Sequence, residues 1–210
     1  MGVSSSGKSG SFFAVLVLSM AIFATAAGET RSPTEAVKAS IKDVFLILQN
    51  QNYDKERRWD EIGRIINSRF DFRSMSQSIL ATNWRAATTE EKRQFVEFFS
   101  RYLEDTYRNK IEAYGDQSIV YVSEQIRKDR AMVDTEIIAQ GKRIPVTYRL
   151  KNNDGDWYAY DVVIEGMSLV SNYRDTFNAI IKSEGMEGLL SDLEVRISNY
   201  KERHGGLPSE

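Results

Sequence analysis

The sequence predicts an α+β fold in which helices come first, an antiparallel sheet of about four strands follows, and helices return. Two changes of periodicity predict this order. Apolar residues recur at helical spacing up to Tyr107, and they alternate with polar residues between Ile119 and Ile164. Helical spacing returns from Asn172 onward. Because helices and sheet each have one apolar face, we expect the helices to pack on a single face of the meander.

Four helices are predicted before the sheet, each from a start signal followed by apolar residues at helical spacing. The start signals are, in order, the capping box Ser32–Glu35, Asp54, the segment Phe70-Asp71-Phe72 and the capping box Thr88–Glu91. The last of these helices is long and is expected to end at Gly115. Two more helices are expected after the sheet, at Asn172–Ser183 and Glu187–Glu202, with Gly185 between them.

The last strand of the sheet follows the turn Asn152–Gly155, whose Asp-Gly pair suits a tight hairpin. Strict alternation divides this strand into two faces. The expected inward face consists of Tyr158, Tyr160, Val162 and Ile164. The expected outward face consists of Trp157, Ala159, Asp161, Val163 and Glu165.

Composition excludes several classes of protein. Of the 210 residues, 41% are hydrophobic and 28% are charged, which is typical of an ordinary globular domain. The net charge of −2 gives a nucleic-acid partner no electrostatic support. The chain has no cysteine, so disulfides and thiolate metal sites are excluded. Neither a catalytic motif nor a cofactor motif occurs, and we expect no catalytic residue, cofactor or metal.

The first 26 residues are predicted to be a secretory signal peptide. Lys8 precedes the apolar run Phe12–Phe23, and Ala24-Thr25-Ala26 forms a small-residue cleavage pattern. The alternative is an uncleaved anchor, because the uncharged run from Ser9 to Gly28 approaches the length of a membrane span. The expected division is therefore a signal peptide over residues 1–26, one domain over 27–203 and a flexible tail over 204–210.

Two long fragments resemble a known family. The first, W-x-x-Y-D-V-x-I-E-G-x-S-L-V-x-N-Y-R, runs from Trp157 to Arg174 and resembles the signature of the MlaC, or toluene-tolerance, family. The second contains Phe70-Asp71-Phe72, Met75-Ser76, Trp84-Arg85, Phe95, Phe99 and Thr106-Tyr107. The resemblance implies a soluble periplasmic phospholipid carrier of Gram-negative bacteria. Its implied partners are phospholipid, an outer-membrane lipoprotein complex and the lipid-binding ring of an inner-membrane ABC transporter.

Many large apolar side chains are expected on the interior between sheet and helices. From the residues alone, they either fill a core or line a hollow. The resemblance implies an apolar cleft, with acyl chains between the sheet and the helices Phe95–Tyr107 and Asn172–Ser183. The candidate lipid-binding residues are Phe70, Phe72, Met75, Phe95, Phe99, Tyr102, Tyr148, Tyr160, Val162, Ile164, Tyr173 and Phe177.

The remaining candidates are charged. Asp161 and Glu165 lie four residues apart on one strand, about 13 Å, which is too far for a paired-carboxylate site. We expect either one to form an ion pair with Arg149 or Arg174. The alternative is that one of these arginines binds the phosphate of a lipid head group.

Three other functions stay open from the sequence. One is a carrier of another apolar cargo such as a hopanoid. Another is an enzyme on a related cone-shaped α+β scaffold, with Asp161 as general base. The third is an envelope protein of purely structural function, with a filled core.

Overall fold

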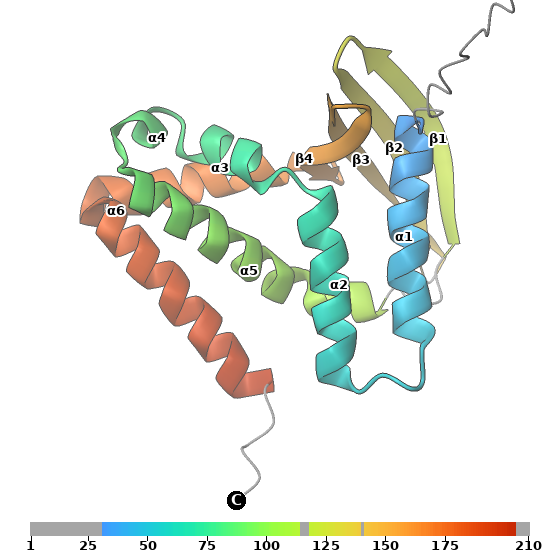
Figure 1. The fold of residues 1–210 in the computed structure, drawn as a ribbon, viewed down its shortest axis with the longest axis horizontal. Helices are drawn as coiled ribbons and strands as arrows, with labels where there is room; N and C mark the ends of the chain where they lie inside the picture. Colours follow the sequence, from blue (N-terminus) through green and yellow to red (C-terminus); the bar gives the residue numbers. More distant parts are fainter. Residues whose placement is uncertain (1–30, 114–117, 140, 205–210) are drawn as a thin grey trace, which may run out of the picture.

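The computed structural model describes residues 31–113, 118–139 and 141–204, whose arrangement Figure 1 shows. The predicted signal peptide and the predicted helix end at Gly115 lie outside the described residues, as do residues 205–210 of the predicted tail. His204, predicted to begin that tail, is the last residue of the final helix. Within the described residues, no helix combines the length and the apolar character needed to cross a membrane.

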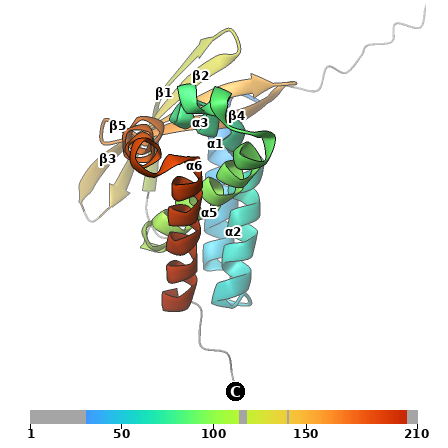
Figure 2. The same ribbon diagram turned by 90° about the vertical axis from the view of Figure 1, so that its left-hand side faces the viewer.

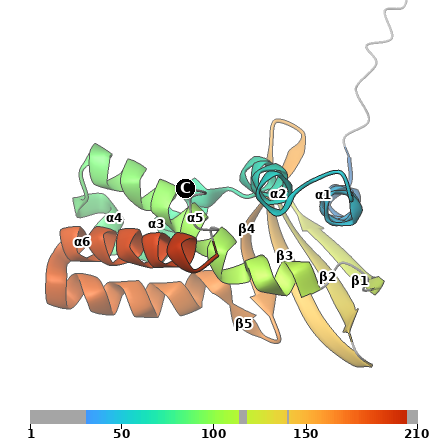
Figure 3. The same cartoon turned by 90° about the horizontal axis from the view of Figure 1, so that it is seen from below.

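The predicted α+β order is confirmed. The helices α1 (Pro33–Gln49), α2 (Lys55–Arg69), α3 (Phe72–Leu80), α4 (Thr82–Ala86) and α5 (Thr89–Ala113) precede the sheet. The sheet contains β1 (Ser118–Arg127), β2 (Arg130–Ala139), β3 (Lys142–Asn153), β4 (Asp156–Ile164) and β5 (Met167–Ser168), paired antiparallel in this order. The chain ends with α6 (Leu169–His204). Figure 3 shows α1 and α2 end-on beside the sheet.

Local signals place the helix starts where the sequence predicts them. The Ser32 hydroxyl accepts a hydrogen bond from the Glu35 amide, and the Glu35 carboxylate accepts one from the Ser32 amide. Asp54 accepts from the Arg57 amide at 2.7 Å and so caps α2. These caps satisfy amides that have no partner inside the helix.

The later turns also follow the sequence. Asp154 and Gly155 both have positive φ, 53° and 94°, as a tight hairpin between β3 and β4 requires. Gly185 (φ 74°) kinks α6 between its two halves, where two separate helices were expected. That helix begins at Leu169, three residues before the predicted start at Asn172, because the β4–β5 hairpin is short.

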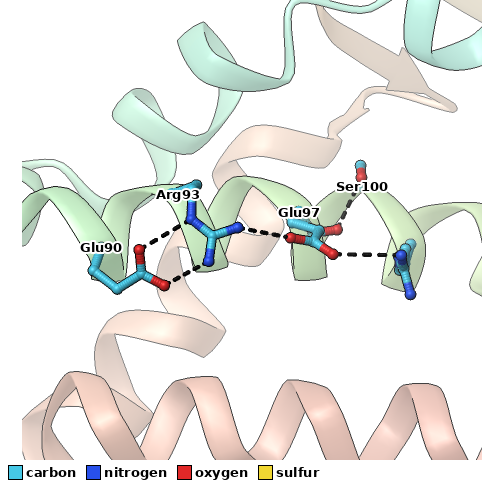
Figure 4. A network of polar contacts seen from close by, with 5 residues as sticks. Glu90, Arg93, Glu97 and Ser100 are labelled. Carbon is cyan, nitrogen blue, oxygen red and sulfur yellow. Dashed lines mark hydrogen bonds and ion pairs between the residues drawn. The ribbon is translucent and has the colours of Figure 1, made fainter.

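The outer face of α5 is held by charge pairs, as Figure 4 shows. The Arg93 guanidinium lies 2.5 Å from Glu90 and 3.3 Å from Glu97, at helical i,i+3 and i,i+4 spacings. The hydrogen bond from Arg93 lowers the pKa of the Glu90 carboxyl below its usual value. The Ser100 hydroxyl donates to the Glu97 carbonyl on the same helix.

The opposite face of α5 enters an aromatic core that it shares with α3 and α6. Phe95, Phe99 and Phe177 are almost completely buried there. The Phe99 ring centroid lies 5.9 Å from that of Phe95, 5.5 Å from that of Tyr173 and 6.2 Å from that of Phe177. These separations match the contact distances of interacting aromatic rings, so this part of the interior is filled.

A second contact joins α2, α5 and α6. Arg108 of α5 lies between two aromatic rings, 4.7 Å from the centroid of Trp59 on α2 and 5.4 Å from that of Tyr200 on α6. The Trp59 indole N–H also donates to Glu112 of α5 at 2.6 Å. Figure 2 shows α2, α5 and the second half of α6 on the same side of the molecule.

A β-bulge in β4 overturns part of the predicted face assignment. Arg149 pairs with Asp161 and Leu150 with Ala159, so Tyr160 is an extra residue without a partner on β3. The extra residue exchanges the two faces. Trp157 and Ala159 are therefore buried on the inner face before the bulge, and Val162 and Ile164 lie on the inner face after it.

The prediction that Tyr158 and Tyr160 face inward is consequently wrong. The Tyr160 ring instead lies 4.6 Å from the guanidinium of Arg130, an exposed residue that precedes the buried, inward-facing Ala131 on β2 and so lies on the opposite face.

Candidate functional site

An apolar pocket of about 340 Å³ lies between the helices and the sheet. Its walls are α1, α2, the second half of α5 and the inner face of β1 to β4. The volume lies within the range of about 300–1,000 Å³ that is typical of ligand pockets. The predicted apolar cleft between sheet and helices is confirmed.

The pocket walls follow from the apolar periodicity of their elements. On α1 the lining residues fall on one helical face, which predicts a stripe directed at the sheet. On the sheet they are the inward residues of each strand. Representative lining residues are Val37, Ile41, Val44 and Phe45 of α1, Ile65 and Ile66 of α2, Leu103 and Tyr107 of α5, and Ile119, Ile137, Ile144, Val146, Leu150 and Trp157 of the sheet.

The exposure of the lining residues differs along the pocket. Val37, Leu150 and Trp157 are buried. Ile41 and Ile144 also line the pocket and are part-exposed. An elongated apolar molecule can therefore reach the pocket beside the part-exposed residues and pack against the buried ones.

Few charged groups line this pocket. They are Arg69, Glu104, Lys110 and Glu165. Burial raises the pKa of the Glu104 carboxyl, which accepts a hydrogen bond from the Asn67 amide at 2.7 Å. The Lys110 ammonium lies 5.2 Å from the centroid of the Tyr107 ring.

Sequence reasoning missed Arg69, Glu104 and Lys110 as pocket residues. Their only local signal is position, because Arg69 directly precedes Phe70, and Glu104 and Lys110 each lie three residues from Tyr107.

Tyr148 is a polar group inside this apolar pocket. Burial raises the pKa of its phenol well above the usual range, so the hydroxyl remains protonated. Val133 of β2 and Val162 of β4 pair with it across the sheet, and both are buried. A protonated phenol can donate one hydrogen bond to whatever occupies the pocket.

The predicted lipid-binding residues divide into two groups. Phe70, Tyr148, Val162 and Ile164 line the pocket, and Glu165 does so as well. The rest, apart from Tyr160, lie in or against the aromatic core and do not line the pocket: Phe72, Met75, Phe95, Phe99, Tyr102, Tyr173 and Phe177.

The expected position of the cleft therefore requires a correction. From α6 the pocket takes Leu169 and none of the segment Asn172–Ser183, because that segment packs against α3 and α5. The wall opposite the sheet is formed by α1 and α2 instead.

Three of the charged candidates, Asp161, Arg149 and Arg174, make contacts that hold the fold together. Asp161 is buried and accepts hydrogen bonds from the Arg149 guanidinium at 3.0 Å, the Ser168 hydroxyl at 2.7 Å and the Val170 amide at 3.1 Å. These contacts attach the start of α6 to β4. The Arg174 guanidinium donates to the Ser78 carbonyl at 2.8 Å and joins α6 to α3. Of these groups, none lines the described pocket.

Comparison with known proteins is consistent with this architecture. Residues 38–195 match the family model described as MlaC protein. The toluene tolerance protein ttg2D of Pseudomonas putida is 26% identical over 192 residues, 88% of this chain and 87% of that protein. The intermembrane phospholipid transport system binding protein MlaC of Haemophilus influenzae is 22% identical over 126 residues, 57% of this chain and 59% of that protein.

A solved structure has the same fold. The phospholipid-binding protein from Ralstonia solanacearum, solved in complex with a phospholipid, superposes with a TM-score of 0.72 at 23% identity. The alignment covers 79% of this chain and 96% of that one. Because the family match extends over most of the sequence, from the first helix into the last, this chain belongs to the MlaC family.

Proposed function

We propose that this chain is a periplasmic phospholipid-binding protein that encloses acyl chains between the α1–α2 pair, α5 and the sheet. The observation that carries the proposal is the apolar pocket, whose lining includes both buried and part-exposed residues. Family membership supports it, since one relative is named as a phospholipid transport binding protein and a structural neighbour was solved with a phospholipid.

The physical requirement for such a carrier is enclosure of the tails. Each buried methylene contributes about 0.8 kcal/mol, so two acyl chains exposed to water cost on the order of 20 kcal/mol. Unaided transit through an aqueous compartment is therefore negligible. A pocket with apolar walls and few charges removes that cost and needs no metal, nucleotide or nucleophile.

Within this proposal, the acyl chains contact Phe70, Tyr148, Val162 and Ile164. The aromatic core beside α6 gives rigid support and does not contact the lipid. The head group remains in contact with water. Lys110 is a better candidate for the phosphate than Arg149 or Arg174, because Lys110 lines the pocket and both arginines make framework contacts elsewhere.

The biological role proposed is shuttling. The predicted signal peptide directs export, and the mature chain carries phospholipid between an outer-membrane lipoprotein complex and the lipid-binding ring of an inner-membrane ABC transporter. The transporter supplies the energy through ATP, and the chain itself is not an enzyme. Such transfer maintains the lipid asymmetry of the outer membrane.

Native mass spectrometry of protein purified without detergent from a Gram-negative periplasm tests the binding step. The expected result is a complex whose excess mass equals that of a phospholipid, identified after extraction by lipid mass spectrometry. Lipid-free protein that also takes up no phospholipid from vesicles would contradict the proposal. A hopanoid in the extract would support a carrier function but identify a cargo other than phospholipid.

A further inference from the structure

The Tyr148 hydroxyl is a donor on a half-buried side chain, and the fold leaves its use open. The side chain lines the pocket, between Val146 and Leu150 on the same face of β3. Within the described residues, no hydrogen bond from this hydroxyl to another protein group is formed. The hydroxyl is not fully shielded from solvent, so a molecule in the pocket can reach it.

An apolar cargo that fills the pocket displaces water from this hydroxyl, and a hydroxyl left without an acceptor there is unfavourable. A phenylalanine at this position would provide the same apolar surface without that penalty. The hydroxyl is therefore best explained by an acceptor that arrives with the cargo.

The surroundings restrict the kind of acceptor. Val133, Val146, Leu150 and Val162 are all apolar and buried. The titratable group that acts on the Tyr148 phenol is Tyr121, whose own phenol stays neutral because burial raises its pKa. A charged acceptor would require a compensating cation in these surroundings, whereas a neutral carbonyl requires only one donor.

We propose that the Tyr148 hydroxyl donates a hydrogen bond to an ester carbonyl of the bound lipid, and that the pocket thereby prefers ester-linked over ether-linked phospholipids. The inference rests on the proposed function, because it presumes a lipid in the pocket. Ester and ether lipids of equal chain length and head group bury the same tails. They differ at the carbonyl oxygen, which is the atom that the phenol would recognise.

The test is competitive loading of the mature protein from vesicles. The vesicles contain equal amounts of diester and diether phosphatidylethanolamine with matched chains of about sixteen carbons, because the pocket must enclose the tails. Lipid mass spectrometry of the reisolated protein gives the ratio of the two. We expect wild type to favour the diester about fivefold, the value of one ordinary net hydrogen bond. Tyr148→Phe should reduce the ratio to about one, with diether loading unchanged.

Tyr160→Phe is the matched control, because this tyrosine of β4 faces Arg130 on the other side of the sheet and should keep the wild-type ratio. The melting temperature of Tyr148→Phe should equal or exceed that of wild type, since the hydroxyl has no protein partner to lose. Equal loading of the two lipids by wild type, or a preference that survives in Tyr148→Phe, would overturn the ester site. Uptake of neither lipid would instead overturn the proposed function, and the ester site with it.

Discussion

The aromatic core between α3, α5 and α6 differs from the pocket between α1, α2 and the sheet, although both are lined by large apolar side chains. In the core, ring centroids lie 5.4 to 6.3 Å apart across Phe95, Phe99, Tyr102, Tyr173 and Phe177. In the pocket, isoleucine and valine are the most frequent lining residues. Among the described residues, no pair of aromatic rings makes contact between opposite walls of the pocket. The difference shows that an apolar interior is filled where side chains from opposite walls are long enough to contact one another, and is hollow where they are not.

The largest effect should come from deleting a ring in the filled region. Phe99→Ala should reduce the free energy of unfolding by about 3–5 kcal/mol, because removal of the ring leaves a cavity that the surrounding buried rings cannot fill. Chemical denaturation measures this change. Phe45→Ala, the same deletion in the pocket wall, should cost far less, because Phe45 is part-exposed and borders space that is already empty. Equal losses in the two variants would mean that the pocket is packed as tightly as the core.

Enlarging a side chain should have different effects in the two regions: loss of stability in the core and loss of lipid uptake in the pocket. Ile79 is completely buried in the core, so Ile79→Trp should destabilise the fold by about 1–3 kcal/mol through overpacking. Ile137→Trp adds the same volume in the pocket and should leave stability within about 1 kcal/mol of wild type, while lipid uptake from vesicles falls at least tenfold. Undiminished uptake by Ile137→Trp would place the lipid elsewhere.

Asp161 provides a test in the framework that joins β4 to α6. Asp161→Asn should lower the free energy of unfolding by about 1–3 kcal/mol, since the amide cannot accept all three hydrogen bonds that the carboxylate accepts. Thermal melting checks this value, with Glu165→Gln as a control carboxylate that lines the pocket. Lipid uptake per folded molecule should stay unchanged, and loss of uptake in a folded Asp161→Asn protein would revive a functional role for this group.

Glu104 should produce the smallest effect, and one that depends on pH. Burial raises the folded-state pKa of this carboxyl above its usual value of 4.5, so ionisation in the folded protein is penalised above that pH. Glu104→Gln imitates the protonated acid and should raise the melting temperature at pH 7 by about 2 °C. The gain should disappear as the pH falls below 4.5, where folded and unfolded states both hold the proton. A gain that is independent of pH would point to a cause other than this titration.

Much of the fold is predictable from the sequence because its signals are local. The capping boxes, the Asp-Gly hairpin and the break at Gly185 each depend on a few adjacent residues, and the structure places all three as expected. The β-bulge at Tyr160 is not local. It lies next to Ala159, whose carbonyl accepts from the Asp71 amide at 2.8 Å, so the chain between α2 and α3 joins the sheet there. The alternation of residues within β4 therefore does not predict the bulge, because the contact involves a segment far away in the sequence.

The position of the pocket was harder to predict than its existence. The stripe on α1 that contains Val37 and Ile41 has the same periodicity as the stripe on α6 that contains Tyr173 and Phe177. Periodicity states that a face is buried, but not against which partner. Here α6 packs against α3 and α5, which leaves α1 and α2 to face the sheet.

A crystal structure of protein loaded with phospholipid and grown without detergent tests the central claim most directly. We predict continuous density for acyl chains between Ile41 of α1 and Ile137 of β2, with the aromatic core around Phe99 unchanged. Side chains that close this space and leave the lipid bound on another surface, or unbound, would contradict the account.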